Sequence, residues 1–332
     1  MSITIKRLSE ISGYSTATIS RVISGAENVK PETREAIEKL LVEYNYRTNV
    51  MELRQRRTGA KQVMILVGDL DNWYYMEIIR TMNRQILKDG YIPVIMYTDN
   101  LLEQEEDLVR MALLENMAGI VFLNVRGDEK LKEILEKNDC PVVFLNRGIR
   151  RASFDSVCND NYHGGFQATE YLIRHGHRKI GHVMGSIYSS TAQERKRGYE
   201  DAMREYGLTV TKNSILMGNQ HYETSYQCGE KIIRAGLDFT ALFCCSYQVA
   251  EGVLDSFADY GVKVPEDISV LCFDDTPGMA RRGITTLCAD PEKMGTTAWD
   301  LLKNRIHGTT TESSMISLQT RLRERTSVRD IR

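Results

Sequence analysis

The chain has 332 residues, 42% of them hydrophobic, which predicts two or three domains with sizeable apolar cores. No apolar run approaches the roughly 18 residues that a membrane span needs, and the N-terminus MSITIKRLSE lacks the apolar stretch of a secretory signal. The net charge of −2 combines a basic head, with ten Lys/Arg against seven Asp/Glu in residues 1–59, and an acidic remainder, so nucleic-acid contact is expected at the head alone.

Two short helices are predicted near the N-terminus, in TIKRLSEISGYSTATISRVI. Ile5, Leu8 and Ile11 recur at helical spacing, so we expect one apolar face on the first helix. Gly13 suits the end of that helix because glycine adopts the left-handed conformation at little cost. Ser15 can then cap the start of the second helix.

The second helix has two contrasting sides when its residues are placed at about 100° intervals. Hydroxyls can bond phosphates or bases, methyl groups can contact thymine, and an arginine can bond a guanine edge. The polar side therefore predicts a helix that enters a DNA groove, although an ordinary helical hairpin fits the spacing as well. The apolar side holds Ile19, Val22 and Ile23, and the opposite side holds Thr16, Ala17, Ser20, Arg21 and Ser24.

A third helix is expected to begin at Pro31, with an apolar stripe at Ile37, Leu40, Leu41 and Tyr44. Three helices of this length make a small bundle. The basic stretch RTNVMELRQRRTGAK follows without sustained apolar periodicity. It indicates a linker that can become helical when a partner orders it.

Beyond Gln62 short apolar runs alternate with amphipathic stretches, which predicts parallel sheets covered by helices on both faces. The number of runs favours two α/β lobes, with a ligand site in the cleft between them. The pair Cys244-Cys245 is expected in a buried strand, and seven irregularly spaced cysteines are typical of reduced thiols in a cytoplasm. The predicted strands are VMILVG, IPVIMYT, GIVFL, PVVFL, KIGHVMG, ALFCC, DISVLCF and MISLQTRLRERTSV, and the predicted helices span 75–87, 103–116, 129–138, 165–175, 192–206, 225–235 and 249–260.

The phrases TIKRLSEISGYSTATISRVISG, VKPETREAIEKLLVEYNYRTN and VPEDISVLCFDD resemble the LacI/GalR family of bacterial transcriptional repressors over essentially the whole chain. The resemblance implies an α-helical helix-turn-helix domain joined to an α/β core of two parallel-sheet lobes, folded like periplasmic sugar-binding proteins. It also implies a homodimer that binds a pseudo-palindromic operator in double-stranded DNA, controlled by a small polar effector (a sugar or related metabolite) in the cleft. The expected domains are 1–47 for the helix-turn-helix, 48–60 for a hinge and 61–332 for the core, with a first lobe at about 61–160 and 292–320 and a second lobe at about 161–291 and 321–332.

The resemblance also assigns DNA-contacting positions, with base reading by residues of the second helix. The hinge departs from the family pattern, in which a leucine enters the minor groove and kinks the DNA. An ungapped count puts Gln55 at that position, Leu53 can replace it if the register shifts, and a flexible basic linker that kinks nothing is the alternative. The expected DNA-binding residues are Thr4, Ser15, Thr16, Ala17, Thr18, Ser20, Arg21, Asn28, Asn49, Leu53, Arg54, Gln55 and Arg56.

Effector contacts are likewise implied by the resemblance. The rings of Tyr74 and Tyr75 can stack on a flat ligand, and Arg195 can hold paired hydroxyls or a carboxylate unless it forms a surface ion pair. Ser246-Tyr247 stands where many sugar-responsive members carry Asn-Asp, so a modified sugar, a nucleoside-like molecule or no small effector remain alternatives. The expected effector-binding residues are Asn72, Tyr74, Tyr75, Asp160, Ser189, Thr191, Arg195, Gln220, Ser246 and Asp274.

Other classes of function lack their motifs in this sequence. No Gly-rich phosphate loop follows VMILVG and no Gly-x-Ser-x-Gly turn occurs, so we expect no enzyme, no catalytic residue and no cofactor. His175 and His177 suit a turn better than a metal site. A periplasmic receptor would need a signal peptide, and the absence of terminal leucine heptads favours a dimer. Control by a protein partner is the main alternative to a small effector.

Overall fold

The computed structural model describes residues 4–23, 26, 29–43, 61–124, 129–146, 154–219, 221–310 and 312–332. Several predicted contacts lie outside these described residues: Asn28, Gln220 and the hinge positions Asn49, Leu53, Arg54, Gln55 and Arg56. Within the described part of the chain, no helix is both long enough and apolar enough to cross a bilayer.

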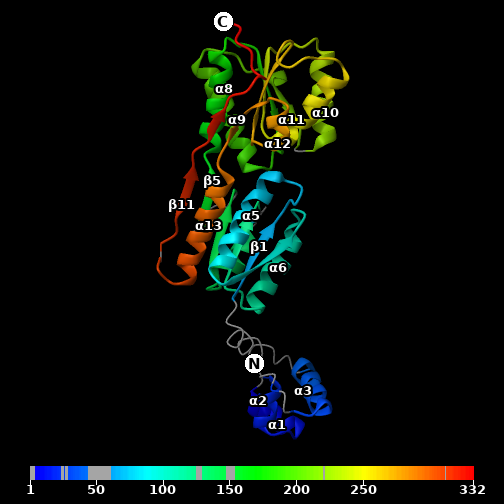
Figure 1. Cartoon of the computed structure of the whole chain (residues 1–332), viewed down its shortest axis with the longest axis vertical. Helices are drawn as coiled ribbons and strands as arrows, with labels where there is room; N and C mark the ends of the chain where they lie inside the picture. Colours follow the sequence, from blue (N-terminus) through cyan, green and yellow to red (C-terminus); the bar gives the residue numbers. More distant parts are fainter. Residues whose placement is uncertain are drawn as a thin grey trace.

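The head contains three helices, α1 (Ile5–Ser12), α2 (Thr16–Ile23) and α3 (Pro31–Glu43) (Figure 1). Gly13 ends α1 with a φ of 72°, as predicted. Ile11 was expected on the apolar face of α1 but is 41% exposed. Ser12 instead faces the bundle, four residues after Leu8. The buried core of the head consists of Leu8, Ile19, Val22, Ile23, Ile37 and Leu41.

The first lobe is a six-stranded sheet with the order β11-β5-β4-β3-β1-β2, and all of its pairings are parallel. Alternate residues of β1 face opposite sides: Val63, Ile65 and Val67 pack with α5 and α13, while Met64 and Leu66 pack with α6 and α7. The elements are β1 (Lys61–Val67), α5 (Trp73–Lys88), β2 (Tyr91–Tyr97), α6 (Leu102–Leu114), β3 (Gly119–Leu123), α7 (Glu129–Glu136), β4 (Val142–Leu145), β5 (Asp155–Asn159), α13 (Pro291–Ile306) and β11 (Met315–Leu318).

The second lobe is a six-stranded sheet with the order β12-β10-β9-β8-β6-β7, in which β12 runs antiparallel to β10. Helices α8 and α9 pack on one face, and α10 and α11 pack on the other. Cys244 and Cys245 are buried as predicted, and all seven cysteines are free thiols. The elements are α8 (Asn161–Arg174), β6 (Ile180–Met184), α9 (Ser190–Glu205), the 3-10 helix η1 (Lys212–Ser214), β7 (Ile215–Met217), α10 (Tyr222–Arg234), β8 (Ala241–Cys244), α11 (Tyr247–Asp259), β9 (Ser269–Phe273), α12 (Pro277–Arg281), β10 (Thr285–Cys288) and β12 (Arg321–Arg323).

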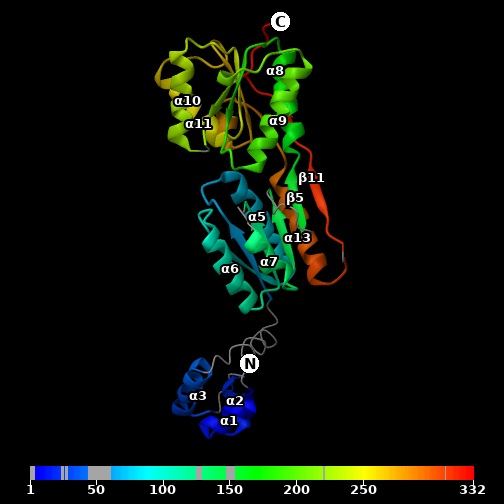
Figure 2. The ribbon, with the colours of Figure 1, turned by 180° about the vertical axis from the view of Figure 1, so that it is seen from behind.

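The chain passes between the lobes three times: after β5, after β10 and between β11 and β12. Figures 1 and 2 show β5, β11 and α13 side by side near these crossings. The C-terminal run MISLQTRLRERTSV was expected as one strand, and this expectation is wrong. The run leaves the first sheet after Leu318 and joins the second at Arg321, so its two halves pair with different lobes. The two-lobed α/β fold itself is confirmed.

Candidate functional site

The α2 helix presents a polar face to solvent, opposite its apolar contacts with the head core. Thr16, Ala17, Ser20 and Arg21 are exposed on this face. Together they offer hydroxyls, a methyl group and a guanidinium, which are the groups that contact base edges and phosphates in a major groove.

Three predicted DNA contacts, Thr4, Ser15 and Thr18, also fix the starts of the two helices. The Thr4 hydroxyl accepts a hydrogen bond from the backbone N–H of Arg7 at 3.3 Å. The Ser15 hydroxyl accepts one from the N–H of Thr18 at 3.1 Å and lies 2.8 Å from the Thr18 hydroxyl. These caps satisfy backbone N–H groups that a helix start leaves unpaired. The base-reading candidates are therefore held on a defined helix start.

In the second lobe, Arg195 is the centre of a buried polar group that we call the inner cluster (Arg195, Asp274 and Asn161). Arg195 Nε donates to Asn161 Oδ1 at 2.9 Å, and Nη1 lies 3.8 Å from Asp274 Oδ2. Nη1 also donates to the carbonyl oxygen of Cys245, and the guanidinium carbon lies 3.4 Å from the centre of the Phe273 ring. Arg195 is only 6% exposed, so it is not a surface ion pair.

Asp274 enters the inner cluster from the end of β9, with a backbone φ of 68°. A non-glycine residue adopts this left-handed geometry rarely and at a cost in energy. Its N–H donates to the Leu287 carbonyl oxygen at 2.9 Å, which ties the turn to β10. Burial raises the pKa of the Asp274 carboxyl, and nearby Arg195 opposes that rise.

The two predicted aromatic contacts, Tyr74 and Tyr75, are buried in the core of the first lobe. The Tyr74 hydroxyl donates to Asn159 Oδ1 at 3.2 Å, while the Tyr75 hydroxyl accepts from Asn146 Nδ2 at 3.0 Å. Burial raises the pKa of Tyr74 well above its usual value, and the charge of Asp274 raises it further. The structure thus brings Tyr74 near the inner cluster and bonds Tyr75 elsewhere in the first lobe.

The remaining described candidates lie at helix N-termini, where all of them except Thr191 cap the backbone with their side chains. Such N-termini carry unpaired N–H groups and a positive dipole end, which favour anionic or hydroxyl-bearing ligands. Thr191 is buried against Ser189, at 2.8 Å between their hydroxyls. The capping residues are Asn72 on α5, Asp160 on α8, Ser189 on α9 and Ser246 on α11.

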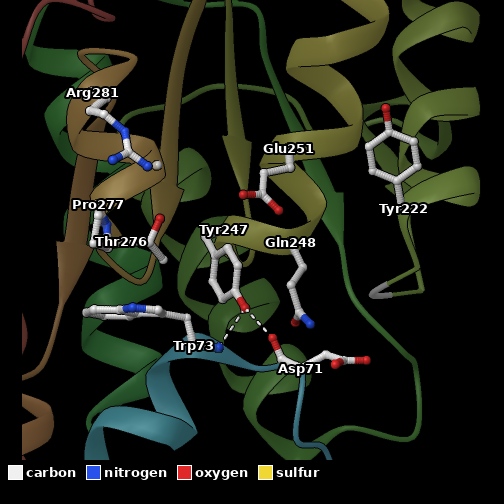
Figure 3. Close-up of a pocket in the computed structure, with 10 residues that line it drawn as sticks. Asp71, Trp73, Tyr222, Tyr247, Gln248, Glu251, Thr276, Pro277 and Arg281 are labelled. Atoms are coloured by element: carbon white, nitrogen blue, oxygen red, sulfur yellow. Dashed lines mark hydrogen bonds between the residues drawn. The ribbon is translucent and has the colours of Figure 1, made fainter.

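The two lobes are joined by a contact that we call the clasp, formed by residues 71–73 of the first lobe and 247–248 of the second. The Tyr247 hydroxyl accepts from the Trp73 backbone N–H at 2.9 Å and donates to the Asp71 carbonyl oxygen at 3.3 Å (Figure 3). Asn72 Nδ2 donates to Gln248 Oε1 at 3.3 Å. The Trp73 ring also packs against the apolar core of the second lobe. The sequence marks Tyr247 as a departure from sugar-responsive relatives, but it gives no signal of this contact between the lobes.

Beside the clasp lies a cavity of about 620 Å³ between the lobes, which we call the outer cavity. Of the predicted effector-binding residues that the structure describes, none lines it. The residues that do so come from the loop before α5 and its first residue, the start of α10, the N-terminal part of α11, and α12 with its N-cap. They are Asp71, Trp73, Tyr222, Tyr247, Gln248, Glu251, Thr276, Pro277, Gly278 and Arg281.

Comparison with known proteins gives matches to both parts of the chain. Residues 4–49 match the model of the bacterial regulatory proteins, lacI family, and residues 169–328 match the periplasmic binding protein-like domain. The HTH-type transcriptional repressor PurR of Vibrio atlanticus (strain LGP32) is 28% identical over 331 residues, covering 99% of each chain. Solved structures that are 26% identical include the transcriptional regulator CelR–cellobiose complex (98% and 99% coverage, TM-score 0.74) and CcpA of Lactococcus lactis (81% and 100% coverage, TM-score 0.75).

Proposed function

Because the chain belongs to the LacI/GalR family and is a DNA-binding transcriptional repressor, we propose that it binds a pseudo-palindromic operator as a homodimer under the control of a small polar effector. The observation that supports this most directly is the exposed polar face of α2 on a basic head, followed by a two-lobed core. Relatives that regulate transcription act on DNA in the cytoplasm, and we propose the same location here. We also propose the division into 1–47, 48–60 and 61–332.

The proposed DNA contact uses charge for affinity and the α2 face for selection. Phosphate contacts by Lys and Arg supply sequence-independent affinity, while base-edge contacts supply specificity. In this proposal Thr16, Ala17 and Arg21 select the half-site. Two heads in one dimer bind two half-sites together, which raises the affinity far above that of a single head.

The proposed effector is a sugar or related metabolite that binds between the lobes. The relative CelR was solved as a complex with cellobiose, which supports a carbohydrate-sized ligand for this fold. A second mode of control has support from the clasp, since Tyr247 joins the lobes directly through hydrogen bonds to two backbone groups. In that mode a protein partner sets the activity of the repressor, or the activity does not depend on a small effector.

The operator proposal is tested by selecting DNA sequences with the purified protein and then titrating the selected site in gel shifts. We expect Arg21→Ala to lower affinity for the selected site while leaving affinity for random DNA nearly unchanged. A good arginine–guanine pair is worth about 1–3 kcal/mol of discrimination. Arg321→Ala, an exposed arginine of β12, is the matched control. Unchanged discrimination by the Arg21 variant would refute the assignment.

A further inference from the structure

The outer cavity has a composition unlike that of the inner cluster, although both lie where the lobes meet. The inner cluster is buried, and its guanidinium is already bonded to protein acceptors. The outer cavity is an open volume of about 620 Å³, within the range of small-molecule sites. Both lobes contribute to its wall, so a molecule bound there contacts the first lobe through Asp71 and Trp73 and the second through α11 and α12.

Two side chains of opposite charge face this cavity without pairing. In Figure 3 the Glu251 carboxylate and the Arg281 guanidinium extend toward the same space from opposite sides. Among the described residues, neither has a hydrogen-bonding or ion-pairing partner. The nearby Arg282 instead pairs with Asp255 at 2.7 Å. Glu251 is half-buried, and burial raises the pKa of its carboxyl.

Three aromatic rings complete the wall, and the hydroxyls of both tyrosines are already used. Tyr247 bonds to the first lobe through the clasp, and the Tyr222 hydroxyl donates to Asp255 at 3.0 Å. The two tyrosines therefore offer ring faces rather than free donors, and the Trp73 ring also lines the cavity. Ring faces next to a carboxylate favour an ammonium group, through cation–π attraction and charge pairing.

We propose that the outer cavity binds a zwitterionic small molecule with an apolar body, whose ammonium group pairs with Glu251 and whose carboxylate pairs with Arg281. This inference rests on the proposed control by a small polar effector, and it names a site for that effector and a chemical class other than a sugar. Such a ligand pairs with both charges at once. A neutral sugar can offer these two side chains only hydrogen bonds from its hydroxyls. Because the ligand contacts both lobes, its binding further stabilises the contact between the lobes at the clasp.

The test is isothermal titration calorimetry on the full-length protein without DNA, using L-phenylalanine as the zwitterion. L-phenylalaninamide lacks the carboxylate, 3-phenylpropionate lacks the ammonium group, and cellobiose is the neutral comparison. We expect L-phenylalanine to bind most tightly. Glu251→Gln should weaken the binding of L-phenylalanine and of its amide roughly tenfold, the usual loss for a charged hydrogen bond. The affinity for 3-phenylpropionate should not change.

Arg281→Gln should show the reverse pattern: it should weaken the binding of L-phenylalanine and 3-phenylpropionate and leave the affinity for the amide unchanged. The exposed residues Glu266 and Arg321 provide the matched controls Glu266→Gln and Arg321→Gln, which should leave all affinities unchanged. No saturable binding of the zwitterion at millimolar concentration, tighter binding of cellobiose, or equal response of all ligands to both variants would overturn the proposal. Because DNA is absent, these outcomes are independent of whether the operator proposal holds.

Discussion

Tyr247 places one hydroxyl between two backbone groups of the opposite lobe. It accepts from the Trp73 N–H and donates to the Asp71 carbonyl oxygen, so both of its hydrogen-bonding roles are used. Burial raises the pKa of Tyr247 well above its usual value, which keeps the hydroxyl protonated and able to donate. A phenylalanine in its place would keep the ring packing and leave both backbone groups without that partner. Because these hydrogen bonds are only partly buried, the cost should lie below that of a fully buried group, which is about 1–3 kcal/mol.

Tyr247→Phe should therefore loosen the clasp selectively. We expect hydrogen exchange at the Trp73 amide to become at least several-fold faster, because its acceptor is lost. The Tyr75 amide, whose acceptor is Asn72 Oδ1 at 3.3 Å, should change less. Tyr222→Phe, which loses a hydroxyl bonded within the second lobe, is the control. Unchanged exchange at Trp73 would show that the clasp is not a stabilising contact in solution.

His182 gives a second residue-scale prediction, concerning pH. The ring is buried, Nδ1 bonds to the Phe243 carbonyl oxygen at 2.9 Å, and Nε2 has no partner among the described residues. A second proton on this ring would be buried without an acceptor, so burial lowers the pKa of His182 from 6.5 to about 4. The unfolded chain thus binds more protons than the folded chain between these values, and stability falls as the pH drops through that window.

Between pH 7 and pH 5 this single group should remove about 2 kcal/mol from the free energy of unfolding. Urea titrations at both pH values measure the loss. His182→Phe should reduce the difference between the two pH values by that amount, whereas His163→Gln, at an exposed position, should not. An unaltered pH dependence in the His182 variant would contradict the prediction.

At the scale of elements, local signals predicted most of the fold and little of the cavity. Helix α2 followed from the Ser15 cap and the spacing of Ile19, Val22 and Ile23, which are local properties. The split between β11 and β12 could not be predicted from the sequence, because both halves have the pattern of a strand. The change from one sheet to the other depends on where the lobes meet. The outer cavity was missed for the same reason: Trp73 and Glu251 are far apart in sequence and meet only when the lobes pack.

The junction of α13 with β5 and β11 offers an element-scale test. The buried carboxylate of Asp155 accepts hydrogen bonds from Arg305 Nε at 2.6 Å and from Arg305 Nη2 at 3.1 Å. It also accepts one from the Ser314 N–H at 2.7 Å. Asp155→Asn removes the charge from a paired, buried site, and we expect a loss of about 3 kcal/mol in the free energy of unfolding. Urea unfolding measures it.

Asp300→Asn on the same helix is the matched control, since Asp300 is more than half exposed and lies 3.6 Å from Lys303. Exposed pairs of this kind contribute less than about 1 kcal/mol. Equal losses for the two variants would show that the Asp155 pair does not hold α13 to the sheet.

At the scale of the whole molecule, the three crossings and the clasp define how the lobes can move. The crossings lie after Asn159, after Cys288 and between Leu318 and Arg321, and all three join the same pair of lobes. The clasp bridges the lobes through the loop before α5 and the start of α11. Motion about the crossings therefore has to stretch or break the clasp. A ligand in the outer cavity, which contacts both sides of the clasp, resists that motion.

This arrangement predicts a reciprocal coupling between the outer cavity and the operator. If the ligand holds the lobes in one arrangement and the operator favours the same or another arrangement, each must alter the affinity of the other by the same factor. Typical couplings are about 1–3 kcal/mol, or roughly 5–150-fold. The measurement is operator affinity with and without saturating L-phenylalanine, compared with L-phenylalanine affinity with and without saturating operator. Tyr247→Phe should reduce both factors together, because it weakens the contact through which the lobes are held. If the ligand saturates the protein and operator affinity stays constant, the cavity is not an allosteric site.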